Sequence, residues 1–160
     1  MHPAAEQVQR QIEEAYALVP YPGDEGIAYS RDAWECPELE ADFRGRHWRS
    51  VPRETLRARS AYLSLFSTLG LHFYLPAFLL AAFEDADIRS FLVSSLEVVD
   101  AGSGKEDLRD WFLRTFGSLT APQKEAIKAF VRHMRDEAPD EVTRADWSRV
   151  LEKYWDRQWA

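Results

Sequence analysis

The chain has 160 residues, of which 46% are hydrophobic and 29% charged, a balance that excludes wholesale disorder and allows a real core. Its formal net charge of -7 argues against a general nucleic-acid binder, because neutralising phosphates needs a basic surface. The single cysteine, Cys36, rules out an intramolecular disulfide, and the N-terminal residues lack the basic and apolar regions of a secretion signal. We therefore expect a cytoplasmic protein.

Apolar residues recur at helical spacing along most of the chain, and strand-like segments are scarce. We expect an all-α protein, a compact single-domain bundle of about six or seven helices over residues 1–160. Ser103 with Glu106, and Thr120 with Gln123, have the spacing of capping boxes at helix starts. The first helix covers residues 3–19, and the others start near Pro52, Thr68, Asp87, Ser103, Thr120 and Thr143.

The stretch Leu71–Phe83 is the longest apolar run of the chain. It has 13 residues, whereas a bilayer crossing needs roughly 20. Because it is apolar on every face, we expect a helix in the middle of the core. Pro76 leaves the carbonyl of His72 without its helical donor, which predicts two helical pieces hinged at Pro76. We interpret His72 as a core histidine bonded to that carbonyl, and His72 and Tyr74 are also candidate binding residues.

Residues 20–47 are predicted to form a long irregular segment. Pro22 and Gly23 fit the two central positions of a type II turn, and residues 27–29 predict a short extended piece. Residues 24–42 contain seven acids and one base, whereas residues 44–59 contain six arginines and one acid. This charge reversal is the sharpest compositional feature of the chain.

Several catalytic motifs are excluded. The segment Gly102–Lys105 resembles a phosphate-binding loop, but the pattern needs glycine where Val99 stands and Ser or Thr where Glu106 stands. Carboxylates near Cys36 raise the pKa of a thiol, which is the opposite of what a nucleophile needs. No helical pair of histidines and no nucleophile-elbow motif occurs.

The acidic loop is the remaining candidate for a ligand site. Its carboxylates offer the oxygen ligands that Mg²⁺ or Ca²⁺ requires, and Tyr21 and Tyr29 lie in the same loop. Two alternatives stay open: a solvated acidic surface without a ligand, and docking of the loop onto Arg53, Arg57 and Arg59. The candidate carboxylates are those of Asp24, Glu25, Asp32 and Glu35.

Near the C-terminus, Trp155 and Trp159 are four residues apart and share a face of any helix that contains both. Tryptophan is favoured at interfaces because one rigid ring supplies a large contact area. The pair is therefore a candidate binding surface, and packing of the rings on the protein's own core is the alternative.

The motifs Tyr-Pro-Gly-Asp at residues 21–24 and Tyr-Leu-Pro-Ala-Phe at residues 74–78 resemble a bacterial family of small proteins known as a domain of unknown function. The similarity extends to Phe43–Gly45, to Leu119–Thr120 and to Tyr154–Trp155, so it covers most of the chain. It implies a bacterial, cytoplasmic, single-domain protein, and no activity or site residue follows from it.

The leading prediction is a non-enzymatic protein–protein interaction module, such as an immunity-type inhibitor or an accessory subunit. An acidic loop would mimic the ligand of a basic partner and speed their association. One alternative is a small enzyme or divalent-metal-binding protein that uses carboxylates of residues 21–35. It predicts a pocket where the Pro-Gly turn meets residues 74–78, with carboxylates converging there. A structural homo-oligomer is the other alternative. No cofactor, nucleic acid or membrane partner is expected.

Overall fold

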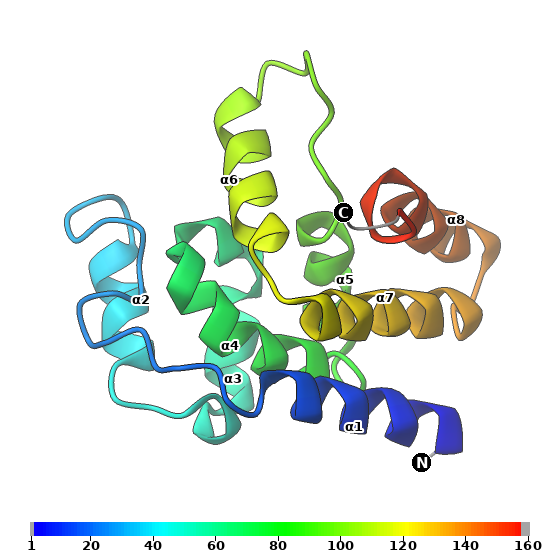
Figure 1. Ribbon diagram of the computed structural model, residues 1–160, viewed down its shortest axis with the longest axis horizontal. Coiled ribbons are helices and arrows are strands. Elements are labelled where there is room, and N and C mark those ends of the chain that lie inside the picture. Colours follow the sequence, from blue (N-terminus) through cyan, green and yellow to red (C-terminus); the bar gives the residue numbers. More distant parts are fainter. Residues whose placement is uncertain (1, 158–160) are drawn as a thin grey trace. The chain divides into compact units, whose positions relative to one another are not determined.

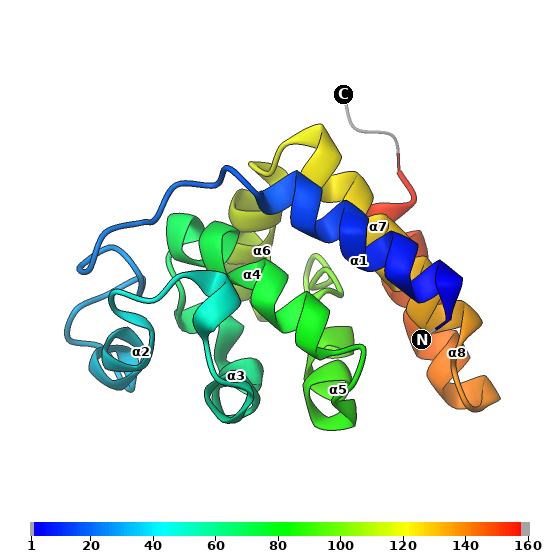
Figure 2. The ribbon, with the colours of Figure 1, turned by 90° about the horizontal axis from the view of Figure 1, so that it is seen from below.

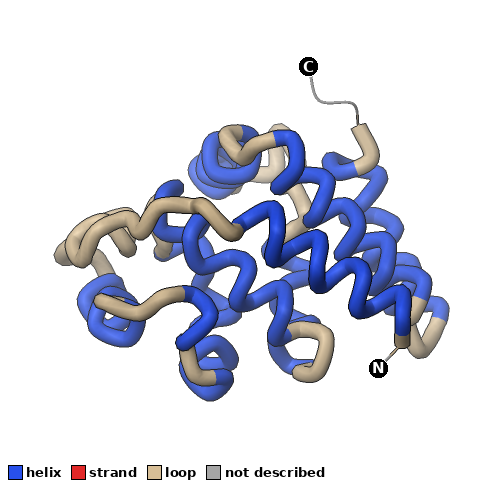
Figure 3. The backbone as a smooth tube through the Cα atoms, turned by 60° about the horizontal axis from the view of Figure 1, so that its bottom comes forward, coloured by secondary structure: helices blue, strands red, loops and turns tan. Residues whose placement is uncertain are grey.

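The computed structural model describes residues 2–157, and their regular secondary structure is entirely helical (Figure 3). The predicted all-α class is confirmed, with eight α-helices in these residues rather than six or seven. The chain divides into two compact units, residues 1–17 with 93–160 and residues 18–92. Each unit is described by itself below, and the single domain over residues 1–160 remains a prediction.

Unit 1, residues 1–17 and 93–160, is built from helices that lie side by side: α1 is alongside α7, and α7 is alongside α8 (Figures 1 and 2). The predicted capping box of α7 is confirmed, because the Thr120 hydroxyl accepts from the Gln123 amide and the Gln123 side chain accepts from the Thr120 amide. The elements are α1 (Pro3–Tyr16), α6 (Glu106–Gly117), α7 (Ala121–Asp136), α8 (Glu141–Val150) and a π-helical turn at Leu151–Trp155.

Aromatic rings that meet edge to face fill the core of unit 1. The ring centroids of Phe116 and Trp155 are 5.6 Å apart, and those of Phe130 and Trp147 are 5.9 Å apart. The indole nitrogen of Trp155 donates to the carbonyl of Leu96 at 2.9 Å. These large rings are therefore buried at little polar cost, since the indole N–H of Trp155 keeps a partner.

Unit 2, residues 18–92, is organised around α4 (Thr68–Ala81). This helix is buried on nearly all sides, as its apolar sequence predicts, including every residue from Phe73 to Leu79. The other elements are α2 (Cys36–Phe43), a 3-10 turn at Trp48–Ser50, α3 (Arg53–Arg59), a 3-10 turn at Ser60–Leu65 and α5 (Ala86–Ser95), which contains the division between the units.

Two predictions about unit 2 are wrong. Helix α4 runs without interruption through Pro76, so the expected hinge into two pieces is absent. Proline removes one amide donor, and the burial of the surrounding residues holds the helix together despite that loss. In addition, residues 20–47 are not irregular throughout, because they contain α2. Pro37 near the start of α2, followed by Leu39 and Phe43 four residues apart, is the sequence signal for this helix.

Several predicted helix starts are also displaced. Helix α6 begins after Lys105, whose side chain does not cap it, so the box of Ser103 with Glu106 does not form. At three other helices an earlier residue than expected accepts the first amide protons: Ser67 instead of Thr68, Asp85 instead of Asp87, and Asp140 instead of Thr143. Within the described part of the chain, no helix combines the length and apolar character needed to cross a membrane.

Gly70 in the first turn of α4 provides a test of how unit 2 is assembled. A Cβ at this position would overlap the backbone carbonyl of Ile27, which is not the end of a flexible side chain. We predict that Gly70→Ala lowers the free energy of unfolding by about 1–3 kcal/mol, although alanine is the better helix former. Urea unfolding measures the change. In the control Gly117→Ala, the nearest atom, the Tyr154 hydroxyl oxygen, is 3.8 Å from the new Cβ, so stability should be kept. Equal effects at both positions would contradict the close approach.

Tyr16 provides a pH test in unit 1. Its hydroxyl is fully buried and has no hydrogen-bond partner among the described residues, and burial raises its pKa well above the ordinary value. The unfolded chain therefore ionises first when the pH rises above about 10, and stability falls by up to about 1.4 kcal/mol per pH unit for this group. We predict that Tyr16→Phe keeps or raises stability at neutral pH and makes the alkaline fall shallower. Urea unfolding at several pH values measures both, and an unchanged alkaline slope would contradict this account.

Candidate functional site

The loop of residues 20–29 is attached to the first turn of α4. The Ser67 hydroxyl accepts from the Gly70 amide at 2.8 Å and donates to the Gly26 carbonyl at 2.6 Å. The Ser67 amide donates to the Ile27 carbonyl, and the Tyr29 amide donates to the Leu65 carbonyl, at 2.8 and 2.9 Å. These last two bonds flank an isolated antiparallel bridge between residues 28 and 66, which accounts for the short extended piece predicted at residues 27–29.

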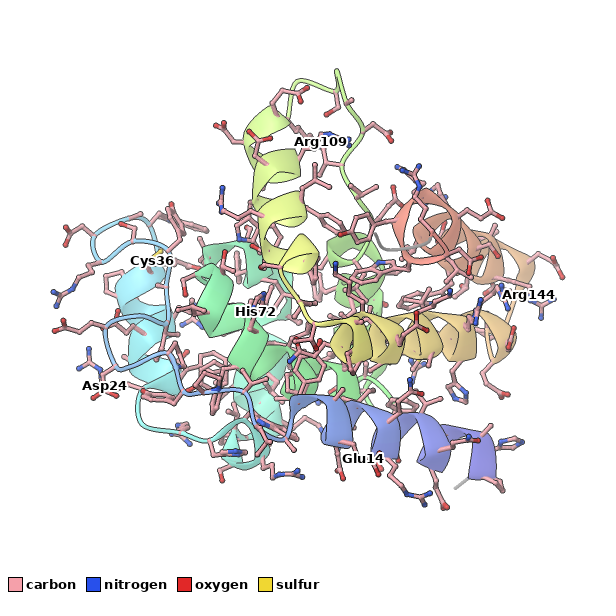
Figure 4. The ribbon with its side chains drawn as sticks, viewed as in Figure 1. Glu14, Asp24, Cys36, His72, Arg109 and Arg144 are labelled. Carbon is pink, nitrogen blue, oxygen red and sulfur yellow. The ribbon has the colours of Figure 1, made fainter. Side chains whose placement is uncertain are left out.

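Tyr21 closes the other end of this loop. Its hydroxyl donates to the Asp24 carboxylate at 2.6 Å and accepts from the Gly45 amide at 2.8 Å. Burial, followed by the hydrogen bond to Asp24, raises the pKa of Tyr21, so the phenol stays protonated at neutral pH. Figure 4 places Asp24 on the loop that precedes α2. The phenol of Tyr21 therefore joins its own loop to the segment around Gly45, which is 24 residues away in the sequence.

Tyr74 on α4 holds the segment that follows α2. Its hydroxyl lies 2.7 Å from the carbonyls of both Phe43 and Arg46, and burial raises its pKa above the ordinary value. The ring also packs edge to face on Phe43, with centroids 4.7 Å apart. The predicted binding residue Tyr74 is thus a buried positioning residue for residues 43–46.

Between these two anchors lies a cavity of about 170 Å³, lined by Tyr21, Gly45, Arg46, His47 and Phe73. The sequence predicted a pocket where the Pro-Gly turn meets residues 74–78, and this cavity lies beside that turn and one residue before that segment. The rings of Tyr21 and Phe73 meet edge to face at 5.5 Å, and those of His47 and Phe73 at 5.4 Å. The cavity therefore has aromatic walls.

The charged groups at the cavity are not those predicted. Arg46 and His47 line it, whereas Glu25 forms an exposed ion pair with Arg31 at 3.1 Å. Asp24 reaches its edge through the bond to Tyr21. No group of three or more His, Cys, Asp or Glu side chains in residues 2–157 is arranged to hold a metal ion.

The acidic loop docks onto the protein's own arginines in part. Arg59 pairs with Asp42 at 2.8 Å and approaches Glu35 at 3.6 Å, as that alternative predicted. Arg53 and Arg57, in contrast, pair with residues that follow α4, namely Glu84 and Asp85, at 2.7 and 2.6 Å. The arginines of the basic segment thus form two separate sets of ion pairs, one with the preceding acidic segment and one with the residues after α4.

A second surface lies around Trp34, in residues 29–38, which we call the aromatic–acidic loop. Trp34 is 69% exposed, and its ring meets Tyr62 edge to face with centroids 5.8 Å apart. The Ser30 hydroxyl accepts from the amides of Asp32 and Ala33 at 3.2 and 3.1 Å. Trp34 therefore directly follows a hydrogen-bonded turn at residues 30–33.

The chain reverses directly after Trp34. Glu35 has a φ of +58°, a left-handed conformation that costs a non-glycine residue roughly 1–3 kcal/mol. The helix α2 then starts at Cys36, labelled in Figure 4. Burial, more than the neighbouring Glu38, raises the pKa of the Cys36 thiol, which agrees in direction with the expectation from sequence.

The remaining predicted site residues lie elsewhere. His72 is a half-buried residue of α4 (Figure 4) and does not line the cavity. Trp155 is fully buried in unit 1, and Trp159 lies outside the described residues.

Sequence reasoning missed Arg46, His47 and Trp34. Arg46 and His47 belong to the basic segment of residues 44–59, whose charge was noted. Trp34 is a large apolar ring inside an acidic loop, and this combination indicates an exposed aromatic side chain.

A family model described as a family of unknown function (DUF6714) matches residues 4–159. No curated protein and no solved structure matches. Because the matching family carries no described activity, functional arguments start from the contacts of the chain itself.

The phenol of Tyr21 provides a direct test of the loop geometry. We predict that Tyr21→Phe lowers stability by about 0.5–1.5 kcal/mol and accelerates hydrogen exchange of the Gly45 amide, which donates to this phenol. The matched control is Tyr29→Phe, because Tyr29 is 57% exposed and its hydroxyl makes no hydrogen bond within the described residues. Exchange of Gly45 at the wild-type rate in Tyr21→Phe would show that the loop is held by other contacts.

Proposed function

The chain belongs to the DUF6714 family, as its resemblance to a family of unknown function predicted, and from its surface chemistry we propose that it is a non-catalytic interaction module that binds a basic protein partner. The aromatic–acidic loop, residues 29–38, is the proposed binding surface. The observation that carries the proposal is Trp34, a large ring that is 69% exposed and yet fixed against Tyr62.

Trp34 has the properties of an interface hot spot. Tryptophan is the type of side chain most often found to dominate binding energy. The hydrogen bonds of Ser30 and the contact with Tyr62 hold the ring in place before binding, so little conformational entropy would be lost when a partner covers it. An exposed tyrosine, Tyr29, belongs to the same loop and is 57% exposed.

The charge of the loop supports a basic partner. Asp32 and Glu38 are exposed and make no ion pair with any residue of the described chain, whereas Glu35 faces Arg59. The whole chain carries a formal charge of -7. A partner with cationic groups around an apolar pocket would complement Trp34 and its acidic neighbours and would be attracted over long range. An immunity-type inhibitor or an accessory subunit is a protein of this kind.

Three groups that resemble catalytic residues are poorly suited to that role. The pKa of Tyr21 is raised, so its phenol stays protonated at neutral pH and is not available as a general base. Cys36 is buried, and its pKa is raised as well. His47 accepts from the Arg49 amide through Nδ1 at 3.1 Å, so this nitrogen is already engaged in a hydrogen bond. These features support a binding role over an enzymatic one.

The homo-oligomer alternative has lost its original support. Trp155 is buried and its indole N–H is bonded to the Leu96 carbonyl, so it does not contribute a free surface with Trp159. Self-association through Trp34 is instead one outcome of the test below.

The test is affinity capture from lysate with matched variants, read by mass spectrometry at low and high salt. We predict that the wild type retains a basic protein. In the isolated pair, Trp34→Ala should weaken binding by at least about 30-fold, corresponding to a hot spot of 2 kcal/mol. The double variant Asp32→Asn with Glu38→Gln should reduce the salt dependence of binding. Leu108→Ala, which changes an exposed residue of α6 in unit 1, is the control and should bind as the wild type does.

Three results would overturn the proposal: equal capture by Trp34→Ala and wild type, an acidic captured protein, or a second copy of this chain as the species retained. Light scattering over a range of concentrations detects the last of these. The fold of each variant is checked first by urea unfolding, where Trp34→Ala should cost no more than the ring contact with Tyr62, about 0.5–1.5 kcal/mol.

A further inference from the structure

The cavity beside Tyr21 offers a second binding site, which is independent of the aromatic–acidic loop. Its wall consists of three rings: those of Tyr21 and His47 each meet the ring of Phe73 edge to face. Two of these rings are fixed by hydrogen bonds: the Tyr21 hydroxyl to Asp24 and Gly45, and His47 Nδ1 to the Arg49 amide. The aromatic wall is thus in place before any ligand arrives.

The backbone turn at the cavity brings a cationic group to its edge. Helix α2 ends at Phe43, and Gly45 has a φ of +73° with open space where a Cβ would be. Glycine in this conformation is the usual way to end a helix and redirect the chain. The turn is locked by the Tyr74 hydroxyl, which lies 2.7 Å from the Arg46 carbonyl, and it places Arg46 and His47 at the cavity.

Arg46 differs from the other arginines of residues 44–59. It is exposed and forms no ion pair with any described residue, so its guanidinium is open to a ligand. The remaining arginines of this segment each have a partner: Arg44 with Glu40, Arg49 with the ring of Trp48, Arg53 with Glu84, Arg57 with Asp85, and Arg59 with Asp42.

The second donor is His47. Because Nδ1 accepts from the Arg49 amide, the neutral ring carries its proton on Nε2 and acts as a donor at that position. The cavity thus combines a guanidinium without an ion-pair partner among the described residues, an imidazole donor and an aromatic wall, with the Asp24 carboxylate at its edge through the bond to Tyr21. Its volume is about 170 Å³, and because Gly45, Arg46 and His47 are exposed it is an open groove rather than an enclosed cavity.

We propose that this cavity binds an aromatic carboxylate. The planar guanidinium of Arg46 matches a carboxylate through two parallel hydrogen bonds, the Nε2–H of His47 donates a further one, and the ring of the ligand packs against Phe73 and Tyr21. The chemistry reverses the cation site expected from the sequence, since Arg46 and His47 offer hydrogen-bond donors to the cavity where carboxylates were expected. The carboxylate belongs either to a free small acid or to the end of a polypeptide with a C-terminal phenylalanine.

The test is an NMR titration of the full chain with benzoate, followed through the amides of residues 45–47. Saturable shifts centred on these amides are expected. Arg46→Gln should weaken binding at least tenfold, whereas Arg53→Gln, which removes the same charge from an arginine paired outside the cavity, should keep the wild-type affinity. Benzamide, which has the ring without the charge, and inorganic phosphate, which has charge without the ring, should bind at least tenfold more weakly than benzoate.

A second titration with a short peptide that ends in phenylalanine separates the two sources of the carboxylate. Tighter binding of the peptide assigns the site to polypeptide ends, and tighter binding of benzoate assigns it to a free acid; both support the proposal. Absence of shifts with either probe, equal affinity in Arg46→Gln, or equal affinity for benzamide or phosphate would overturn it. Arg46→Gln leaves Trp34 unchanged, so the capture experiment above is expected to give the wild-type result with this variant.

Discussion

The close packing of the Gly26–Ile27 backbone on the first turn of α4 is the contact on which the site in unit 2 depends. It requires Gly70, because a Cβ there would overlap the Ile27 carbonyl, and it is completed by Ser67, which caps α4 and bonds Gly26 with one hydroxyl. Since Tyr29 follows directly, this contact also sets where the aromatic–acidic loop begins.

Two further hydroxyl groups fix other segments of unit 2 relative to this contact. Tyr21, a few residues before the packed segment, bonds Gly45, and Tyr74, one turn after Gly70, bonds the carbonyls of Phe43 and Arg46. Each bond joins segments that are distant in sequence. Forming it therefore costs loop-closure entropy, which the hydrogen bonds within a helix do not. The long irregular stretch thereby gains a defined geometry although it contains only one short α-helix.

The sequence predicted those structural features that depend on residues close together in the chain. The all-α class, the capping box of Thr120 with Gln123 and the burial of most of Leu71–Phe83 follow from the local sequence pattern. It predicted a pocket between the Pro-Gly turn and residues 74–78, whereas the observed cavity is lined by the residues next to these segments, Tyr21 and Phe73, and by residues 45–47. It did not predict the basic character of the cavity, because that depends on which arginine finds a distant acid: Arg57 pairs with Asp85 28 residues away, and Arg46 pairs with none of the described acids.

Unit 2 therefore presents two surfaces of opposite chemistry, an aromatic ring among acids at Trp34 and an aromatic cavity with a guanidinium at Arg46. Both use rings held by hydrogen-bonded turns, which lowers the entropic cost of binding. The proposals assign them different ligands, a basic protein and a carboxylate.

The central claim is that these loops are ordered by α4 before any ligand binds, and native-state hydrogen exchange tests it most directly. The amides of Tyr29 and Ser67, which donate across the loop contact, should exchange with the same opening free energy as buried amides of α4, through unfolding of unit 2 as a whole. Exchange of these two amides by local opening, at rates close to those of an unstructured peptide, would contradict the account.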